Sequence, residues 1–172
     1  QTIFMKIKIL SPSDVNENYV NWFSNKEIVR YSDNQYRSFT LEGQRLYVES
    51  CFNNNEIRLY GIFIDEMHIG NILLNGIGSI HKRAELTYVI GEKDYWGKRI
   101  PDESMPLILN YGFNELGLNR IYLYTLNNNE RARKVYERNG FTNEGTLRKH
   151  YFCVGEYQDL MVMSVLKDDF KI

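Results

Sequence analysis

The middle of the chain alternates between strand-type and helix-type segments, and this alternation constrains the fold most. RAELTYVIG (83–91) is apolar at alternate positions, and NRIYLYTL (119–126) has the apolar character of a buried strand. A helix-type segment begins within DYWGKRIPDESMPLILNYGF (94–113) and ends near ELGL, and a second is NNERARKVYERNG (128–140). Two strands joined through a helix run parallel, with a right-handed crossover. We therefore predict parallel central strands, with a ligand outside their carboxyl ends, where residues 95–102 lie.

The two ends of the chain add further strands and helices. Strands are predicted in MKIKIL, in IRLYGIFIDEMHIGNILL around an Asp65-Glu66 turn, and in FTNEGTLRKHYFCVGEYQDLMVMSVL around Gly155. One helix is predicted in SPSDVNENYVNWFSNKEIVRY, with the serines and Asp14 as capping candidates, and another in TLEGQRLYVESCF. This order predicts the α+β class, with a mixed central sheet flanked by helices.

Composition limits the classes of function. A chain of 172 residues, 43% hydrophobic and 25% charged, suits a single domain over residues 1–172. The net charge of −1 gives no basic footprint for nucleic acid, and no apolar run reaches membrane length. Cys51 and Cys153 lack disulfide or metal-site spacing, so we expect free thiols in a reducing cytoplasm and no metal.

The stretch DYWGKRIPDESMPLILNYGF has the character of a glycine-marked turn that opens into a helix. Helix N-termini bind phosphate through unpaired N–H groups, and Gly97 lets phosphate oxygens approach the backbone. Lys98 and Arg99 add positive charge, and Pro101 suits the first helical position. Pro106 costs about 3 kcal/mol inside a helix, so we predict that the helix bends there or begins later.

A larger pattern surrounds this turn. RAELTYVIGEKDYWGK, followed by NYGFNELGLNRIYLYTLNNNERARKVYERNGFTNEGTLR, resembles the GNAT superfamily of acetyl-CoA-dependent N-acetyltransferases. The resemblance covers about residues 5 to 168 and is strongest from Arg83 to Arg148. Within the superfamily, the chain is similar to the branch that holds ribosomal-protein alanine acetyltransferases and spermidine acetyltransferases. The resemblance implies a GNAT fold with a splayed cleft for acetyl-CoA.

The resemblance also implies roles for particular residues. Backbone N–H groups of Val89 and Ile90 would polarise the thioester carbonyl, and Asn129 would hold the pantetheine arm. Tyr136 would protonate the leaving CoA thiolate, with no covalent enzyme intermediate. The pyrophosphate would lie on the turn from Gly97 to Glu103; the cofactor-binding residues predicted there are Gly97, Lys98, Arg99, Ile100 and Asp102.

The chain departs from the family at this turn. Small residues, usually glycine, stand in the family at the positions of Arg99 and Pro101, and a helix former stands at Pro106. Arg99 still has a backbone N–H and adds a guanidinium for a CoA phosphate, whereas Pro101 has no N–H to donate. We interpret the turn as a modified phosphate cradle. The alternative is a non-catalytic GNAT-fold module that binds a ligand without transferring acetyl groups.

An attacking amine must lose a proton, so a general base or a water chain is needed. Glu85 is the first candidate, because it lies on the same strand face as Thr87 and Val89. Glu144, His150 and Asp159 are weaker candidates. His81, beside Lys82-Arg83, is expected in an exposed turn.

The amine acceptor stays open at this point. The resemblance implies a small-molecule or peptide amine as acceptor, bound on a wall formed by the front of the chain, and a homodimer is compatible with the family. The aromatic candidates there suit a sugar ring, a peptide end or an aliphatic amine: Trp22, Tyr31, Tyr36 and Phe39. A polyamine would use carboxylates, from Glu17, Glu27, Asp33, Glu42 and Glu49. A nucleotide-linked amino sugar would use basic residues, from Lys26, Arg30 and Arg37.

Overall fold

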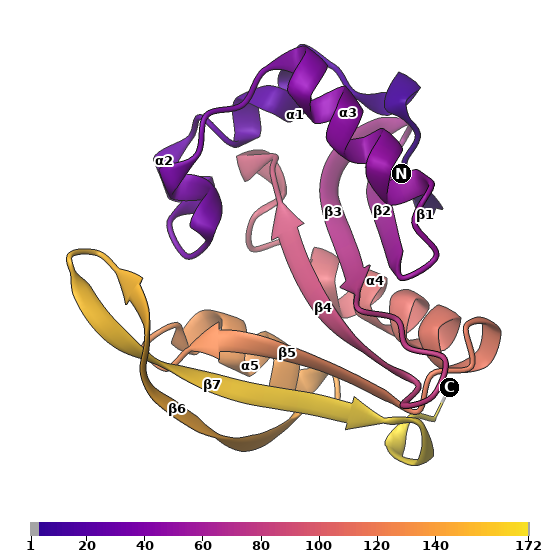
Figure 1. The fold of residues 1–172 in the computed structure, drawn as a ribbon, viewed down its shortest axis with the longest axis vertical. Coiled ribbons are helices and arrows are strands. Elements are labelled where there is room, and N and C mark those ends of the chain that lie inside the picture. Colours follow the sequence, from indigo (N-terminus) through magenta and orange to yellow (C-terminus); the bar gives the residue numbers. More distant parts are fainter. Residues whose placement is uncertain (1–3, 172) are drawn as a thin grey trace. The chain divides into compact units, whose positions relative to one another are not determined.

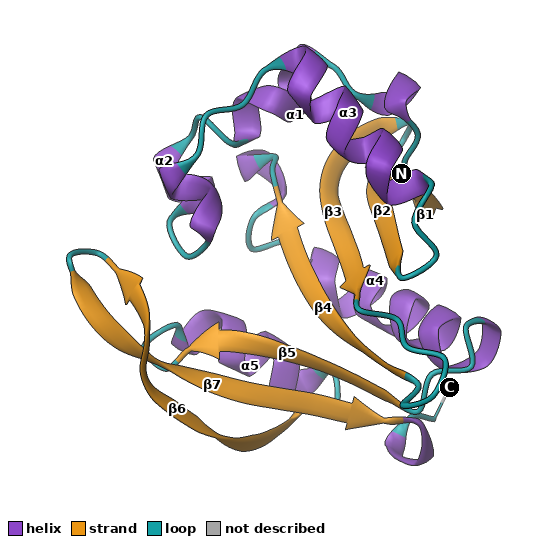
Figure 2. Ribbon diagram, in the orientation of Figure 1, coloured by secondary structure: helices purple, strands orange, loops and turns teal. Residues whose placement is uncertain are grey.

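The computed structural model describes residues 4–171 and contains a seven-stranded sheet in the order β1-β2-β3-β4-β5-β7-β6. Strands β4 and β5 run parallel, whereas the pairs β1–β2, β2–β3, β5–β7 and β6–β7 are antiparallel. Figure 2 shows the strands with their flanking helices. The predicted α+β class with a mixed sheet is confirmed. The strands are β1 (Met5–Ile9), β2 (Ile57–Ile64), β3 (Met67–Asn75), β4 (Arg83–Ile90), β5 (Arg120–Leu126), β6 (Thr142–Cys153) and β7 (Glu156–Leu166).

Helices interrupt the strands as the sequence pattern indicates. The α-helices are α1 (Glu17–Trp22), α2 (Lys26–Val29), α3 (Leu41–Phe52), α4 (Ile100–Asn110) and α5 (Glu130–Arg138). The chain divides into two compact units, which are described separately. The first comprises the residues up to Asn75 together with Thr87–Lys98, and the second comprises Gly76–Leu86 together with the residues from Arg99 onward. A single domain over residues 1–172 stays a prediction.

In the first unit, α3 packs against strand β2, and α1 packs against α3 (Figure 1). Their shared core contains Tyr19, Trp22, Val48 and Phe63, all of which are buried. Helix α3 begins at Leu41 because the Thr40 side chain accepts a hydrogen bond from the Gly43 N–H. The predicted second helix is therefore confirmed, together with the β2–β3 hairpin.

The predicted first helix is wrong in its extent and its cap. Ser11 and Asp14 close only a short 3-10 turn, and α1 begins after Asn16, whose side chain accepts from the Tyr19 N–H at 2.9 Å. The Asn25 side chain then accepts from the Glu27 N–H and starts the separate helix α2. Asparagine side chains favour such N-caps over helix interiors, so they divide the segment into short helices.

In the second unit, the parallel pairing places Arg83–Glu85 opposite Arg120–Tyr122. The β6–β7 hairpin turns at Val154 (φ 54°) and Gly155 (φ 76°), as predicted. Helix α5 is capped by Asn129, whose side chain accepts from the Ala132 N–H at 3.2 Å. Gly117 has φ 69°, the left-handed conformation predicted for the end of the preceding helical segment.

Helix α4 begins at Ile100, so Pro101 is its second residue and Pro106 lies inside it. The helix therefore does not begin later, and the bend at Pro106, the other predicted outcome, stays a prediction. A five-residue π-helical turn, Tyr111–Glu115, continues α4. Pro106 has no N–H for the carbonyl oxygen one turn before it, and its ring crowds that carbonyl group.

Pro106→Ala is expected to raise the free energy of unfolding by about 2 kcal/mol, because a helix interior disfavours proline by about 3 kcal/mol and the freer unfolded chain offsets part of this gain. Pro101→Ala is the matched control and should change stability little, since the N–H of a first-turn residue has no partner within the helix. Chemical denaturation of both variants measures the difference. Equal stability of the two variants would contradict this account of Pro106.

Candidate functional site

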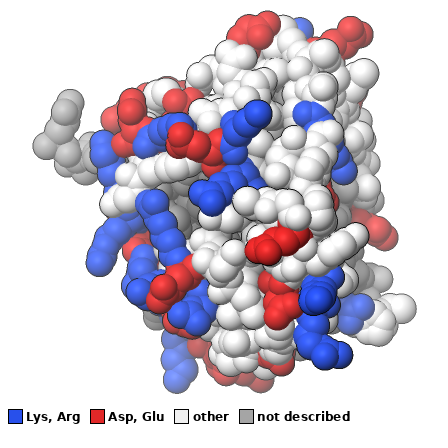
Figure 3. All heavy atoms as spheres, turned by 90° about the vertical axis from the view of Figure 1, so that its left-hand side faces the viewer, with Lys and Arg blue, Asp and Glu red and all other residues white. Residues whose placement is uncertain are grey.

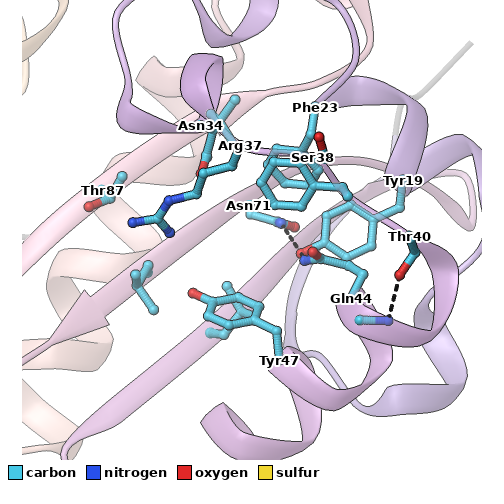
Figure 4. Close-up of a pocket in the computed structure, with 15 residues that line it drawn as sticks. Tyr19, Phe23, Asn34, Arg37, Ser38, Thr40, Gln44, Tyr47, Asn71 and Thr87 are labelled. Atoms are coloured by element: carbon cyan, nitrogen blue, oxygen red, sulfur yellow. Dashed lines mark hydrogen bonds between the residues drawn. The ribbon is translucent and has the colours of Figure 1, made fainter.

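The first unit contains a pocket of about 340 Å³ lined by α1, α3, β3, the second half of β4 and the loop before α3 (Figure 4). This volume lies within the range of small-molecule sites. Thr87 and Val89 both line it, as the strand alternation predicts. The other polar lining residues are Tyr19, Asn34, Arg37, Ser38, Thr40, Gln44, Tyr47 and Asn71.

A buried hydrogen-bond network forms one wall of the pocket. The Tyr19 hydroxyl accepts from the amides of Gln44 and Asn71, both at 2.9 Å, and Asn71 Oδ1 pairs with His68 Nε2 at 2.6 Å. Burial raises the pKa of Tyr19 to about 12 and lowers the pKa of His68, so both groups are neutral near pH 7. This wall is therefore uncharged and held in one arrangement.

Arg37 is the charged residue in the pocket lining. Figure 4 shows its side chain extending into the pocket from the loop before α3. The five carboxylates considered for a polyamine (Glu17, Glu27, Asp33, Glu42 and Glu49) are absent from the lining. Glu27 instead forms an ion pair with Lys93 at 2.7 Å. Lys26 and Arg30 also lie outside the lining.

Phe39 is the predicted aromatic residue that does reach the pocket. Its ring stacks on Phe23, with centroids 4.4 Å apart, and both rings line the cavity. Trp22 is buried instead, and its indole N–H donates to Glu92 at 2.8 Å. Tyr31 and Tyr36 are exposed and lie outside the lining.

The end of β4 is tightly packed within the first unit. The Ile90 carbonyl oxygen accepts from the Trp96 indole N–H at 3.0 Å, and the Gly91 N–H donates to the Ile69 carbonyl oxygen at 2.8 Å. Gly97 has φ 76°, a backbone conformation that glycine adopts without strain. Lys98 is exposed, with its ammonium group 5.5 Å from the centroid of the Tyr95 ring.

In the second unit, Arg99 immediately precedes α4 and has φ 57°, a left-handed conformation that glycine adopts more readily. The Asp102 N–H donates back to the Arg99 carbonyl oxygen at 3.0 Å. The Asp102 carboxylate accepts from Arg138 at 3.2 Å and from Asn139 at 3.0 Å. Burial opposes ionisation, but these hydrogen bonds hold the pKa of Asp102 below its ordinary value. Asp102 thus ties the start of α4 to the end of α5.

Helix α5 carries Tyr136 in its last turn. The side chain is half-buried, and its ring lies 5.7 Å from that of Phe141. Burial of the hydroxyl raises the pKa of Tyr136 to about 12, so this group keeps its proton at neutral pH. A protonated phenol can donate a hydrogen bond or a proton to a developing thiolate.

Glu85 is half-buried on β4, and burial raises the pKa of its carboxyl group. Among residues 4–171 it forms no ion pair, and the neighbouring β5 residue in register is Tyr122. Glu144 differs, because its hydrogen bonds with Arg120 lower its pKa. The Asp159 carboxylate accepts from the Lys149 N–H at 2.7 Å. Glu85 thus combines a raised pKa with an unpaired carboxylate.

Comparisons with known proteins identify the family. A model described as an acetyltransferase (GNAT) domain matches residues 6–142. The chain belongs to the GNAT acetyltransferase family. A spermidine N(1)-acetyltransferase of Vibrio cholerae is 32% identical over 151 residues, which cover 87% of this chain and 86% of that protein. A putative ribosomal N-acetyltransferase of Bacillus subtilis, YdaF, is 33% identical over 111 residues, covering 64% and 60% of the two chains.

A solved structure extends this likeness to the fold. The crystal structure of spermidine N-acetyltransferase from Vibrio cholerae in complex with CoA and spermine matches with a TM-score of 0.86 and 26% identity, over 96% of each chain. This GNAT protein is therefore an acetyl-CoA-dependent N-acetyltransferase, and the alternative of a non-catalytic module is set aside. In the part of the chain that the structure describes, no helix has the length and apolar character needed to cross a membrane.

The predicted site residues of this GNAT chain fall in both units. Val89, Ile90, Gly97 and Lys98 belong to the first unit; Glu85, Arg99, Ile100, Asp102, Asn129 and Tyr136 belong to the second. His81 lies in an exposed turn, as predicted. The Tyr19 network was missed, although Gln44, Val48 and Cys51 share the helical spacing of one buried face of α3. A glutamine on an otherwise apolar face is the signal that points to it.

Proposed function

We propose that this protein transfers the acetyl group of acetyl-CoA directly to a primary amine, with Tyr136 as general acid and Glu85 as general base. Membership of the GNAT family supports the reaction class, and the protonated, partly buried phenol of Tyr136 is the observation that supports its role. Acetyl-CoA supplies an activated thioester. Asn129 would hold the pantetheine arm, and the N–H groups of Val89 and Ile90 would donate to the thioester carbonyl oxygen.

The residues around the start of α4 fit a CoA pyrophosphate. Gly97 and Arg99 both have positive φ, and Ile100 is the first residue of a helix. Such backbone geometry directs N–H groups toward an anion, and the helix dipole favours negative charge there. The Arg99 side chain is exposed and can reach a phosphate, whereas Pro101 has no N–H to contribute. These features support a modified cradle in which Lys98 and Arg99 supplement fewer backbone donors.

Glu85→Gln is expected to lower kcat/KM by roughly 100-fold, because a general base contributes at least that factor. Only the ionised carboxylate accepts a proton, so wild-type activity should rise with pH through a pKa above the ordinary value of 4.5. The variant should lose this acidic limb, whereas Glu144→Gln should keep it. A pH–rate profile measures the limb, and its persistence in Glu85→Gln would exclude Glu85 as the base.

The pocket of the first unit is the proposed acceptor site. The spermidine N-acetyltransferases named above make a polyamine one candidate acceptor, but the pocket lining includes no carboxylate. The lining supplies hydroxyl and amide groups, two stacked phenylalanine rings and one guanidinium group. These groups suit a small amine with polar substituents.

The proposed reaction is tested by incubating the purified protein with acetyl-CoA and a panel of primary amines. The panel contains spermidine, glucosamine, glucosamine 1-phosphate, free amino acids and a peptide with an N-terminal alanine. Release of the CoA thiol and the mass of the product report the transfer. We expect amine-dependent thiol release and an N-acetylated product. Thiol release that does not depend on amine would contradict acetyl transfer to an amine.

A further inference from the structure

Resting on the acetyl transfer proposed above, we propose that the natural acceptor is a small primary amine that also carries an oxyanion, a phosphate or a carboxylate, bound by Arg37. This inference separates the protein from polyamine acetylation. It rests on the charge of the pocket, the position of Arg37 and the chemistry of the remaining lining.

The charge of the pocket lining is positive. Arg37 contributes a guanidinium group, and none of the lining residues is an aspartate or glutamate. A polyamine would bring several ammonium groups toward this guanidinium, without carboxylates to balance them. On the face shown in Figure 3, acidic and basic side chains are intermingled. The pocket thus disfavours a polycation and favours an anion.

Arg37 is placed for a ligand rather than for a partner in the protein. The backbone N–H of Arg37 donates to the Asn34 carbonyl oxygen at 3.1 Å. This hydrogen bond fixes the backbone at the end of the 3-10 turn Asp33–Tyr36. Among the residues that the structure describes, no carboxylate lies within ion-pair distance of its guanidinium. Tyr47 also lines the pocket; burial raises the pKa of its hydroxyl group, and the Arg37 charge opposes this rise. A guanidinium presents paired N–H donors that match the two oxygens of a carboxylate or phosphate.

The remaining lining suits a compact acceptor. Phe23 and Phe39 form a stacked apolar wall, and Ser38, Tyr47 and Thr87 carry hydroxyl groups. Aromatic faces and hydroxyl groups together bind rings that carry hydroxyl substituents. The cavity of about 340 Å³ accommodates a group of the size of an amino sugar or an amino acid. An amino-sugar phosphate and an amino acid share the required amine and oxyanion.

The test compares paired amines, one member of each pair carrying an anion that the other lacks. The first pair is glucosamine 1-phosphate and glucosamine, and the second is alanine and alaninamide; spermidine is assayed beside them. For at least one pair, wild-type protein is expected to acetylate the anionic member with kcat/KM roughly 10- to 100-fold higher, the ratio typical of a charged hydrogen bond. The pair that shows the preference distinguishes a phosphate from a carboxylate.

Arg37→Gln should bring the ratio of kcat/KM between the anionic and the neutral member of the pair close to one. Arg37→Glu should favour the neutral member and should raise kcat/KM for spermidine above that for the anionic amine. Arg45→Gln is the matched control, because Arg45 is an exposed arginine of α3 outside the pocket lining; it should keep the wild-type ratio. Circular dichroism checks that each variant is folded.

The proposal would be overturned by spermidine as the best wild-type acceptor, by a wild-type ratio near one in both pairs, or by an unchanged ratio in Arg37→Gln. Acetyl-CoA binding without acetylation of either anionic amine would also overturn it. Failure of the underlying acetyl transfer is recognised separately, since no amine in the panel would then release the CoA thiol.

Discussion

Tyr136→Phe is expected to lower kcat by roughly 100- to 1000-fold, because it removes the proposed general acid while keeping the aromatic ring. The affinity for acetyl-CoA should stay close to wild type, since the ring still packs beside Phe141. Steady-state kinetics at saturating acetyl-CoA measure the loss. Tyr157→Phe, an exposed tyrosine of β7, is the matched control and should retain wild-type kcat.

The pH dependence supplies a second readout for Tyr136. Its pKa of about 12 means that the phenol stays protonated throughout the neutral and moderately alkaline range. An unperturbed tyrosine, with a pKa of about 10, would lose its proton near pH 9 or 10, and kcat would then fall. Because the pKa of Tyr136 is higher, we expect no such fall of kcat in this range. A limb near pH 9 or 10 that disappears in Tyr136→Phe would contradict the raised pKa. Wild-type kcat in Tyr136→Phe would exclude the general-acid role itself.

Gly91→Ala is expected to lower the free energy of unfolding by about 3 kcal/mol, because this position has no room for a side chain. A Cβ atom at Gly91 would lie 1.9 Å from Trp22 Cδ2. The indole cannot move aside easily, since it packs against Tyr19 and His68 and donates to Glu92. Overpacking of a closely packed core forces side chains out of their preferred rotamers.

Gly78→Ala is the matched control for Gly91→Ala. The nearest atom to a Cβ at Gly78 is 3.9 Å away, and its φ is not in the left-handed region. Chemical denaturation of both variants should show a large loss for Gly91→Ala and little change for Gly78→Ala. Similar stability of the two variants would contradict the packing of Trp22 against Gly91.

The strands and the α5 helix were predictable from sequence because their signals are local. Strands are marked by alternating apolar residues, and the start of α5 is marked by the Asn129 cap. Gly117 and Gly155 mark the end of a helical segment and a hairpin turn. The first helix was not predicted correctly, because Asn16 and Asn25 each cap a new short helix where the apolar spacing indicated one long helix. The spacing of apolar residues does not show which asparagine will act as a cap. Pro106 lies inside α4 although local propensity disfavours it there, since buried Met105 and Ile108 on either side of it stabilise the helix through packing.

The candidate site also has one part that was predictable from local sequence and one part that was not. The family resemblance supplied Tyr136, Asn129 and the turn around Gly97, because these lie in contiguous motifs. The pocket depends on residues far apart in sequence, such as Tyr19 and Asn71, whose pairing no local pattern announces. Equally, the sequence offered five carboxylates and three basic residues for the acceptor, and only tertiary structure distinguishes Arg37 from the rest.

Calorimetric titration of the purified protein with acetyl-CoA tests the central claim most directly, with CoA and desulfo-CoA as comparison ligands. We expect a dissociation constant in the micromolar range, corresponding to a binding free energy of about −8 kcal/mol, because we propose that the turn at Gly97 and Arg99 retains donors for the pyrophosphate. No binding heat at millimolar acetyl-CoA, at two temperatures, would contradict the account, since an enzyme that uses this cosubstrate must bind it.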